Sequence, residues 1–356
     1  MVQSVHGTFI SEKINTIRWR PDAFNDSHSF ITGSWDSDQN NIKLWNFEAS
    51  EDDTEIYPFI IENFEIIGDV TEAKFLNSDY CVVSTSMGTI LCLKLTTTLT
   101  GDIKITQEIC WDKIHHFRCN ENSPCTALAV YDRDIVTVGE DGCINLLNAQ
   151  NTNVSRSIKD ADSCSLNCVA FLKHNEILTG NSRGQMKVWD VREQSSSPAN
   201  SFMLSGDQIA ATCLAHHPTQ RHMVVAGDED GSLTVWDLRQ NVFPINLLNA
   251  HSETVSEIQF HPDHPDQMFS CSFSGELWHW ITNKPVSQAG GKLLTITEME
   301  TNPWLSTESI KNKFEVFMLM PKLHKPINGI DLSRNRVLCG CDNEAIYLIN
   351  NVNIYK

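Results

Sequence analysis

The stretch Met223–Arg239, MVVAGDEDGSLTVWDLR, decides the fold of the chain. Met223–Ala226 is a short apolar run, and Ser232–Trp236 is a second run of strand-forming residues. The residues between these runs end in Asp230-Gly231, and Asp and Gly tolerate the positive φ angles that hairpin turns require. The stretch therefore predicts a strand, a tight turn and a second strand that ends in Trp-Asp. One such hairpin cannot bury its own apolar face, so the number of recurrences matters.

Seven segments of the chain repeat this pattern. The position of Trp236 is filled in order by Trp45, Leu93, Leu147, Trp189, Trp236, Trp280 and Ile349. A strand, a turn and a strand ending in Trp-Asp, at a period of about 40–45 residues, are typical of WD repeats. Seven repeats predict one all-β domain over residues 1–356, a seven-bladed WD-repeat β-propeller. The residues assigned to the repeat signature are Trp45, Asp141, Trp189, Asp190, Asp230, Trp236, Asp237, His251 and Trp280.

The two ends of the chain are expected to meet in the last blade. The seventh repeat supplies three strands before Lys356, while residues 5–11 lie ahead of the first repeat. We expect this N-terminal strand to close the last blade and to cover a sheet edge that would otherwise be exposed. The longest insertion, residues 283–326, is expected to contain the outer strand of blade six, at Phe314–Met320 or, as the second choice, at Leu293–Thr297.

Composition excludes several classes of protein. With 27 Lys and Arg against 45 Asp and Glu, the formal net charge is −18, which disfavours direct binding to a nucleic-acid backbone. The first residues, MVQSVHGTFISEK, lack the basic start and apolar core of a signal peptide. No apolar run approaches the ~18 residues of a membrane span, so no membrane insertion is expected. The 12 cysteines are therefore expected to be reduced thiols in an intracellular protein.

No motif argues for catalysis, a cofactor or a metal ion. Gly180-Asn-Ser-Arg-Gly184 matches the GxSxG nucleophile motif, but a strand follows it where that motif requires a helix. His216-His217-Pro218 and His261-Pro262 follow inner strands and are interpreted as turn residues rather than metal ligands. His251 resembles the histidine of the repeat that bonds toward a turn aspartate. Because Ser274 stands at that turn position in its blade, the network is predicted to be incomplete there.

Several strings resemble one family more closely than the repeat pattern requires. They are Arg18-Trp-Arg-Pro21, Thr32-Gly-Ser-Trp-Asp36, Ile135–Leu146, Asp160-Ala-Asp-Ser163, Glu176-Ile-Leu-Thr179, Trp304-Leu-Ser306 and Glu344-Ala-Ile-Tyr347. Together they make the chain similar to the small, 43-kDa type WD-repeat nucleoporins of the Y-shaped scaffold complex of the nuclear pore. The resemblance spans nearly the whole chain and departs mostly in loops, such as the acidic residues 48–55.

The resemblance implies a non-enzymatic scaffold subunit. Its partners would be other scaffold nucleoporins, the α-helical solenoid subunits in the short arm of the Y. It would lie in the nuclear pore complex at the nuclear envelope, supporting protein transport and mRNA export, with a kinetochore role in mitosis for animals. No short motif marks the surface that binds the partner.

An alternative from another class rests on Arg192 and Arg239. Trp189-Asp-Val-Arg192 and Trp236-Asp-Leu-Arg239 fit WDxR, a pattern that resembles substrate receptors of cullin-RING ubiquitin ligases, in which the Arg contacts the ligase adaptor. An exposed Arg at this turn can bind a carboxylate or carbonyl of a partner. It can equally form an ion pair with the Asp of its own turn. A third alternative, a reader of phosphopeptides or histone tails, would need a basic or aromatic-lined central pocket.

Overall fold

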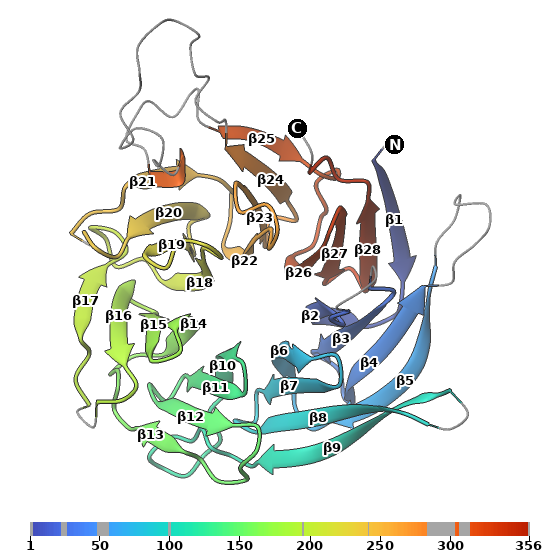
Figure 1. Cartoon of the computed structure of the whole chain (residues 1–356), viewed down its shortest axis with the longest axis horizontal. Coiled ribbons are helices and arrows are strands. Elements are labelled where there is room, and N and C mark those ends of the chain that lie inside the picture. The colour runs from blue at the N-terminus through green and yellow to red at the C-terminus, as the bar shows by residue number, and fades with distance from the viewer. Residues whose placement is uncertain are drawn as a thin grey trace, which may run out of the picture.

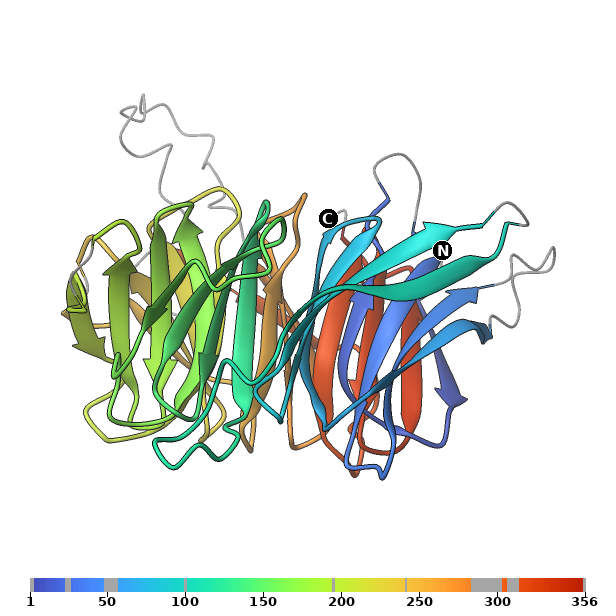
Figure 2. The ribbon, with the colours of Figure 1, turned by 90° about the horizontal axis from the view of Figure 1, so that it is seen from below.

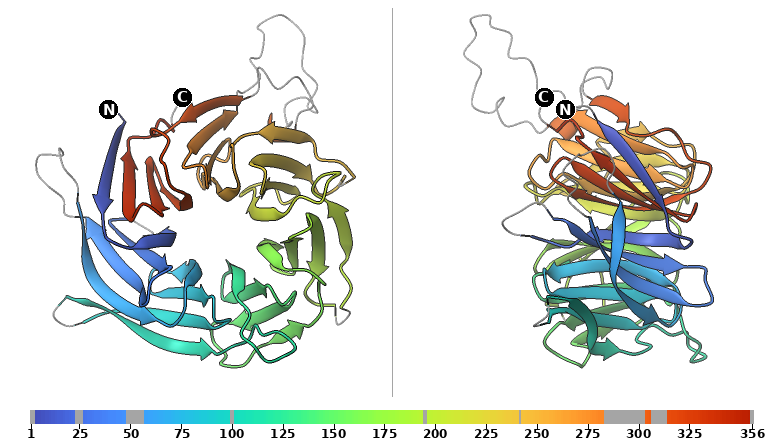
Figure 3. Two further views of the ribbon diagram at one scale, coloured as in Figure 1. Left: turned by 180° about the vertical axis from the view of Figure 1, so that it is seen from behind. Right: turned by 90° about the vertical axis from the view of Figure 1, so that its right-hand side faces the viewer.

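The computed structural model describes residues 3–22, 27–47, 57–98, 101–193, 196–240, 242–282, 303–305 and 314–354. In these residues the strands form seven four-stranded antiparallel sheets, arranged as blades around a central axis (Figures 1 and 3). Figure 2 shows the ring from the side, with the strands crossing its thickness. The fold is the seven-bladed β-propeller that the sequence predicted.

Blades one to four are continuous in sequence. From the axis outward, blade one contains β2 (Lys13–Trp19), β3 (Ser29–Trp35), β4 (Asn40–Phe47) and β5 (Pro58–Ile66), and blade two contains β6 (Val70–Asn77), β7 (Tyr80–Thr85), β8 (Ile90–Thr97) and β9 (Ile103–Trp111). Blade three contains β10 (Cys125–Tyr131), β11 (Asp134–Gly139), β12 (Ile144–Asn148) and β13 (Arg156–Ile158). Blade four contains β14 (Leu166–Lys173), β15 (Glu176–Asn181), β16 (Gln185–Asp190) and β17 (Asn200–Met203).

Blades five and six follow the same plan, and blade seven combines both ends of the chain. Blade five contains β18 (Ala211–His216), β19 (Met223–Asp228), β20 (Ser232–Asp237) and β21 (Asn246–Asn249). Blade six contains β22 (Val255–Phe260), β23 (Gln267–Ser272), β24 (Leu277–Thr282) and β25 (Phe314–Met318). Blade seven contains β26 (Ile327–Ser333), β27 (Arg336–Cys341), β28 (Ala345–Asn350) and, on the outside, β1 (Ser4–Phe9).

The N-terminal strand closes the ring. β1 pairs antiparallel with β28 over six residues, from Ser4 opposite Asn350 to Phe9 opposite Ala345. This pairing covers the outer edge of β28, which would otherwise be exposed. The predicted closing strand is thus confirmed. In blade six, β25 pairs with β24 from Phe314 to Met318, within the preferred segment. The second choice, 293–297, lies outside the described residues.

The hairpin turn of the deciding stretch has the geometry that its sequence requires. Gly231 has a φ of +89°, in the left-handed region that favours glycine. A Cβ atom there would lie 2.4 Å from the carbonyl oxygen of His251. The turn therefore packs directly against the segment that enters the next blade, and the glycine is needed for both reasons.

A short 3-10 helix, η2 (Pro303–Leu305), is packed into the side of the ring. Trp304 is fully buried, with its ring 5.7 Å from that of Phe260 and 4.9 Å from that of Phe314. Its Nε1 donates to the Pro265 carbonyl at 3.2 Å, and its own carbonyl accepts from Asn246 Nδ2 at 2.7 Å. The long insertion is therefore fixed to blades five and six at this point.

Polar side chains at one position of the inner strands join neighbouring blades at six of the seven joints in the described residues. The donors and the carbonyls that accept from them are Asn15 and Val70, Thr126 and Leu166, Asn167 and Ala211, Thr212 and Val255, Ser256 and Ile327, and Asn328 and Ile14. At the joint between blades two and three, Thr71 bonds Ser84 of its own blade at 2.8 Å. Because neighbouring sheets share no strand ladder, these bonds fix their relative positions at the axis.

Candidate docking surfaces

The signature tryptophans lie in the interior and bond to hydroxyl groups of their own sheets. Trp45, Trp189 and Trp280 donate through Nε1 to Thr32, Thr179 and Ser270 of the neighbouring strand at 2.8, 3.0 and 2.9 Å. In blade five Trp236 donates to Thr234 of its own strand at 3.1 Å. A buried indole N–H without a partner would be costly, so the Thr or Ser is part of the signature. These residues support the blades and are inaccessible to partners.

The turn aspartates fall into two groups. Asp141 lies 3.0 Å from His115 Nδ1, and His115 Nε2 lies 2.9 Å from the hydroxyl of Thr137. Hydrogen bonds and the charge of His115 offset burial, and the pKa of Asp141 is lowered. Asp230, at the equivalent place in blade five, is exposed. There Asp228 is buried and accepts from the backbone N–H groups of Asp230 and Ser232.

Sequence reasoning missed His115 because an insertion displaces it. His251 precedes the first residue of its inner strand, Val255, by four positions, whereas His115 precedes Cys125 by ten. The Asp141 turn that faces it was the available signal, since a buried turn carboxylate needs a donor.

The network around His251 includes a residue that the sequence analysis did not consider. His251 Nε2 lies 2.8 Å from the hydroxyl of Ser270, which also accepts from Trp280. On the other side, Glu276 Oε2 lies 3.5 Å from His251 Nδ1, and this nitrogen has no hydrogen-bond partner among the described residues. Burial lowers the pKa of His251 to about 4, so the imidazole is neutral at pH 7. Glu276, two residues beyond Ser274, thus places a carboxylate near His251 in a blade whose turn lacks the usual aspartate.

Arg192 and Arg239 each form a fork with the aspartate of their own turn. Arg192 donates from Nε and Nη2 to Asp190 at 3.0 and 2.6 Å. Arg239 does the same to Asp237 at 2.9 and 2.6 Å. Both arginine side chains are about two thirds exposed, at 65 and 64%. The intramolecular alternative of the sequence analysis is therefore the arrangement present, and it engages the Nε and Nη2 groups of each guanidinium.

A buried arginine organises one side of the central channel. Arg18, in the inner strand of blade one, donates to Glu72 of blade two at 2.6 Å and to the Ile330 carbonyl of blade seven at 2.9 Å. It also lies 2.8 Å from Glu257 of blade six. Lys74 lies 3.7 and 3.6 Å from the same two carboxylates. This network joins four blades, and its four charges balance.

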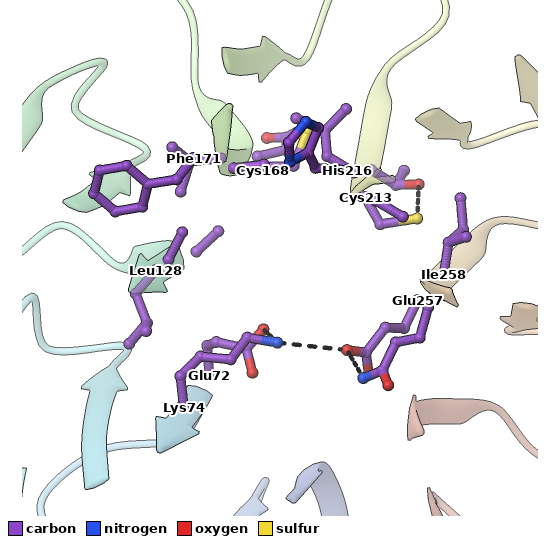
Figure 4. A pocket seen from close by; sticks show the side chains of 18 of the residues that line it. Glu72, Lys74, Leu128, Cys168, Phe171, Cys213, His216, Glu257 and Ile258 are labelled. Carbon is purple, nitrogen blue, oxygen red and sulfur yellow. Dashed lines mark hydrogen bonds and ion pairs between the residues drawn. The ribbon is translucent and has the colours of Figure 1, made fainter. Parts of the chain in front are cut away.

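The channel is a cavity of about 1130 Å³ whose two sides differ in chemistry. Figure 4 shows Lys74 beside Glu72 and facing Glu257 on one side, and Leu128, Phe171 and Ile258 on the wall. Among the lining residues, four are cationic and two anionic: Arg18, Lys74, Lys173 and Arg221 against Glu72 and Glu257. The lining thus has a formal charge of +2 in a chain of −18.

Comparison with known proteins places the chain in a family. Residues 201–237 match the model of the WD domain, G-beta repeat. The chain is 33% identical over 377 aligned residues to nucleoporin Nup43 of Homo sapiens and to that of Mus musculus, covering 98% of this chain and of each relative. The chain belongs to the Nup43 family of nucleoporins. Nuclear pore complex protein nup43 of Dictyostelium discoideum is 30% identical over 62% of this chain and 51% of its own length.

In this member of the Nup43 family, exposed apolar side chains lie on the outer strands of three consecutive blades. They are Val316, Phe317 and Met318 on β25, Val5 and Phe9 on β1, and Phe59 and Ile60 on β5. The outer ends of blades six and seven are linked, because Gln3 Nε2 donates to the Leu319 carbonyl at 2.7 Å. We call these seven side chains the apolar perimeter. Apolar gatherings of this kind on soluble proteins mark interaction sites.

The 12 cysteines are free thiols, and burial raises the pKa of several, for example that of Cys168 to about 12. Within the described ranges no group of three or more His, Cys, Asp or Glu side chains could hold a metal ion. No helix in the same ranges is long and apolar enough to cross a membrane.

Proposed function

We propose that this chain is a non-enzymatic scaffold subunit of the nuclear pore complex. The observation that carries the proposal is the 33% identity to nucleoporin Nup43 over 98% of both chains. A ring closed by its own terminal strand is a rigid platform, and its surfaces are complete without a donated strand. The cullin-RING alternative has no support from the relatives, and its two arginines are engaged with their own aspartates.

The partners proposed are α-helical solenoid nucleoporins in the short arm of the Y-shaped complex. The apolar perimeter is the proposed docking surface, because a helical solenoid presents apolar stripes that such a surface can cover. Protein import and mRNA export would be supported through the architecture of the pore. Any contribution to mRNA export would be indirect, since a chain of formal charge −18 repels a phosphate backbone.

The proposal is tested by the partners that the chain captures in cells. A tagged chain would be purified at moderate salt and its partners identified by mass spectrometry, beside an Arg192→Ala, Arg239→Ala double variant. We expect scaffold nucleoporins in stoichiometric amounts with both versions. Recovery of a cullin and its adaptor, lost in the double variant, would establish the ligase alternative instead.

The docking surface has its own test. Phe9 of the perimeter is 68% exposed, and Phe243 in blade five, off the perimeter, is 77% exposed. Phe9→Glu should reduce the recovery of scaffold nucleoporins about tenfold or more, because it places a charge in an apolar contact. Phe243→Glu makes the same change elsewhere and should leave recovery unchanged. Equal effects of the two variants would show that the perimeter is not the docking surface.

A further inference from the structure

The channel opens between the first turns of blades three, four and five into a mouth that is aromatic and basic. Tyr131 ends β10, and its ring lies 5.8 Å from that of Phe171 and 5.7 Å from the imidazole of His174. Arg221 follows β18 in blade five, and it lines the same cavity as these three residues. The first turns of all blades lie on one face of the ring, so these side chains surround one opening.

The charges at this mouth are mostly paired, as they are deeper in the channel, with one exception. At depth, Arg18 and Lys74 are balanced by Glu72 and Glu257. At the mouth, Lys173 is paired with Glu176 at 2.8 Å, and both side chains are partly exposed. His174 lies 3.0 Å from Asp134.

Arg221 differs from these groups because it is exposed and has no ion pair in the part of the chain that the structure describes. Its carbonyl is held by His216 Nε2 at 3.2 Å, which leaves the guanidinium available. Burial lowers the pKa of His216, so this imidazole is neutral at pH 7 and adds no charge. The free positive charge at the mouth is therefore carried by Arg221, with Lys173 beside it on blade four.

Below the charged turns, the walls of the cavity are apolar on the side of blades three to six. Leu128 and Phe171 line one part, and Ile258 lies opposite them near Cys213 (Figure 4). A segment that enters the mouth would therefore meet cations and an aromatic ring first and apolar side chains behind them. This order fits a peptide that carries carboxylates next to a large apolar residue.

We propose that this mouth binds an acidic peptide segment of a partner protein, with carboxylates on Arg221 and Lys173 and an apolar side chain against Tyr131. A guanidinium can bind a carboxylate through two parallel hydrogen bonds. Complementarity favours an acidic segment because the cavity lining is net positive in a chain that otherwise repels acidic partners. The inference rests on the proposed docking role, since it gives the chemistry of one docked segment, but it concerns a surface distinct from the apolar perimeter.

The test uses the full purified chain and a synthetic probe. Fluorescence anisotropy would follow a fluorescein-labelled 12-residue peptide of alternating Glu, Asp and Leu, beside a peptide in which Lys replaces the acids. Arg221→Gln is compared with Arg239→Gln, because each removes one exposed arginine charge from the same face of blade five. The two variants have equal net charge, but only Arg221 lines the cavity, whereas Arg239 is paired with Asp237 of its own turn.

We expect the acidic peptide to bind the native chain, with an affinity that falls as salt rises. Arg221→Gln should weaken binding about tenfold, the loss of one charge-assisted contact. Arg239→Gln should change it less than about twofold, and Tyr131→Ala should weaken it severalfold. Absence of binding, equal losses in the two arginine variants, or preference for the Lys peptide would each overturn the inference. None of these outcomes affects the recovery of scaffold nucleoporins from cells, so the two proposals fail separately.

Discussion

Asp141 and Asp230 occupy equivalent turn positions in blades three and five, but only Asp141 has a buried partner. Asp141 contacts both the imidazole of His115 and the backbone N–H groups of His116 and Cys143. His115 is fully buried, so removing the carboxylate would leave its Nδ1 without a partner. The side chain of Asp230 has no hydrogen bond or ion pair among the described residues and faces solvent, although its backbone N–H donates to Asp228.

We therefore expect the same substitution to lower the free energy of unfolding by different amounts at the two aspartates. Asp141→Ala should lower the free energy of unfolding by about 2 kcal/mol, the range for a lost bond that leaves a buried polar group unsatisfied. Asp230→Ala should change it by less than about 0.5 kcal/mol. Urea denaturation of the purified variants measures both. If Asp230→Ala cost as much as Asp141→Ala, the assignment of the buried network to blade three would be wrong.

At the scale of the strands, the closing strand β1 carries a prediction of its own. It pairs with β28 over six residues, so about six backbone hydrogen bonds join the two ends of the chain. At a net ~0.5–1.5 kcal/mol for each bond, deletion of residues 1–9 should cost at least about 3 kcal/mol. Deletion of residues 1–2, which precede the strand, is the control. Unchanged urea midpoints for both deletions would show that the ring is held without β1.

Strands could be predicted from the sequence where the information is local. The turn before Trp189 or Trp236 and the apolar alternation around it occur within one hairpin, so the seven blades followed from the pattern. The closing strand followed from counting the strands at the two ends of the chain, and β25 lies in the preferred one of two candidate segments. The buried network of Arg18 could not be predicted, because its partners Glu72 and Glu257 come from blades two and six. Which side chains of distant blades meet depends on the geometry of the closed ring.

The surfaces of the whole molecule were the least predictable part. The WDxR arginines were chosen because a short motif marked them, and in the structure they are engaged with Asp190 and Asp237. The mouth of the channel has no motif. Tyr131, His174 and Arg221 are ordinary turn residues in the sequence, and they form a surface only because three consecutive blades place their first turns around one opening.

Buried titratable groups distributed over the ring predict how the stability of the whole molecule depends on pH. Burial lowers the pKa of both His217 and His251 to about 4. An unfolded chain protonates these histidines near pH 6.5, so it binds more protons than the folded chain between pH 6.5 and 4. Burial raises the pKa of Asp331 to about 6, so between about pH 4 and 6 the folded chain holds a proton that the unfolded chain has lost. The contribution of Asp331 to stability therefore changes with pH in the opposite direction to that of the histidines.

Two histidines outweigh one aspartate, so stability should fall as the pH drops from 6.5 to 4. Each pKa unit corresponds to ~1.4 kcal/mol, which gives a net loss of roughly 3 kcal/mol over this window. Burial also lowers the pKa of His216 and His261, which adds to the loss.

Urea denaturation at pH 7.0, 6.0, 5.0 and 4.5 should show this decline in stability. A His217→Gln, His251→Gln double variant, less stable at pH 7, should nevertheless have a flatter profile, whereas the exposed His28→Gln should leave the profile unchanged. A steep profile that persists in the double variant would assign the acid sensitivity to the carboxylates instead.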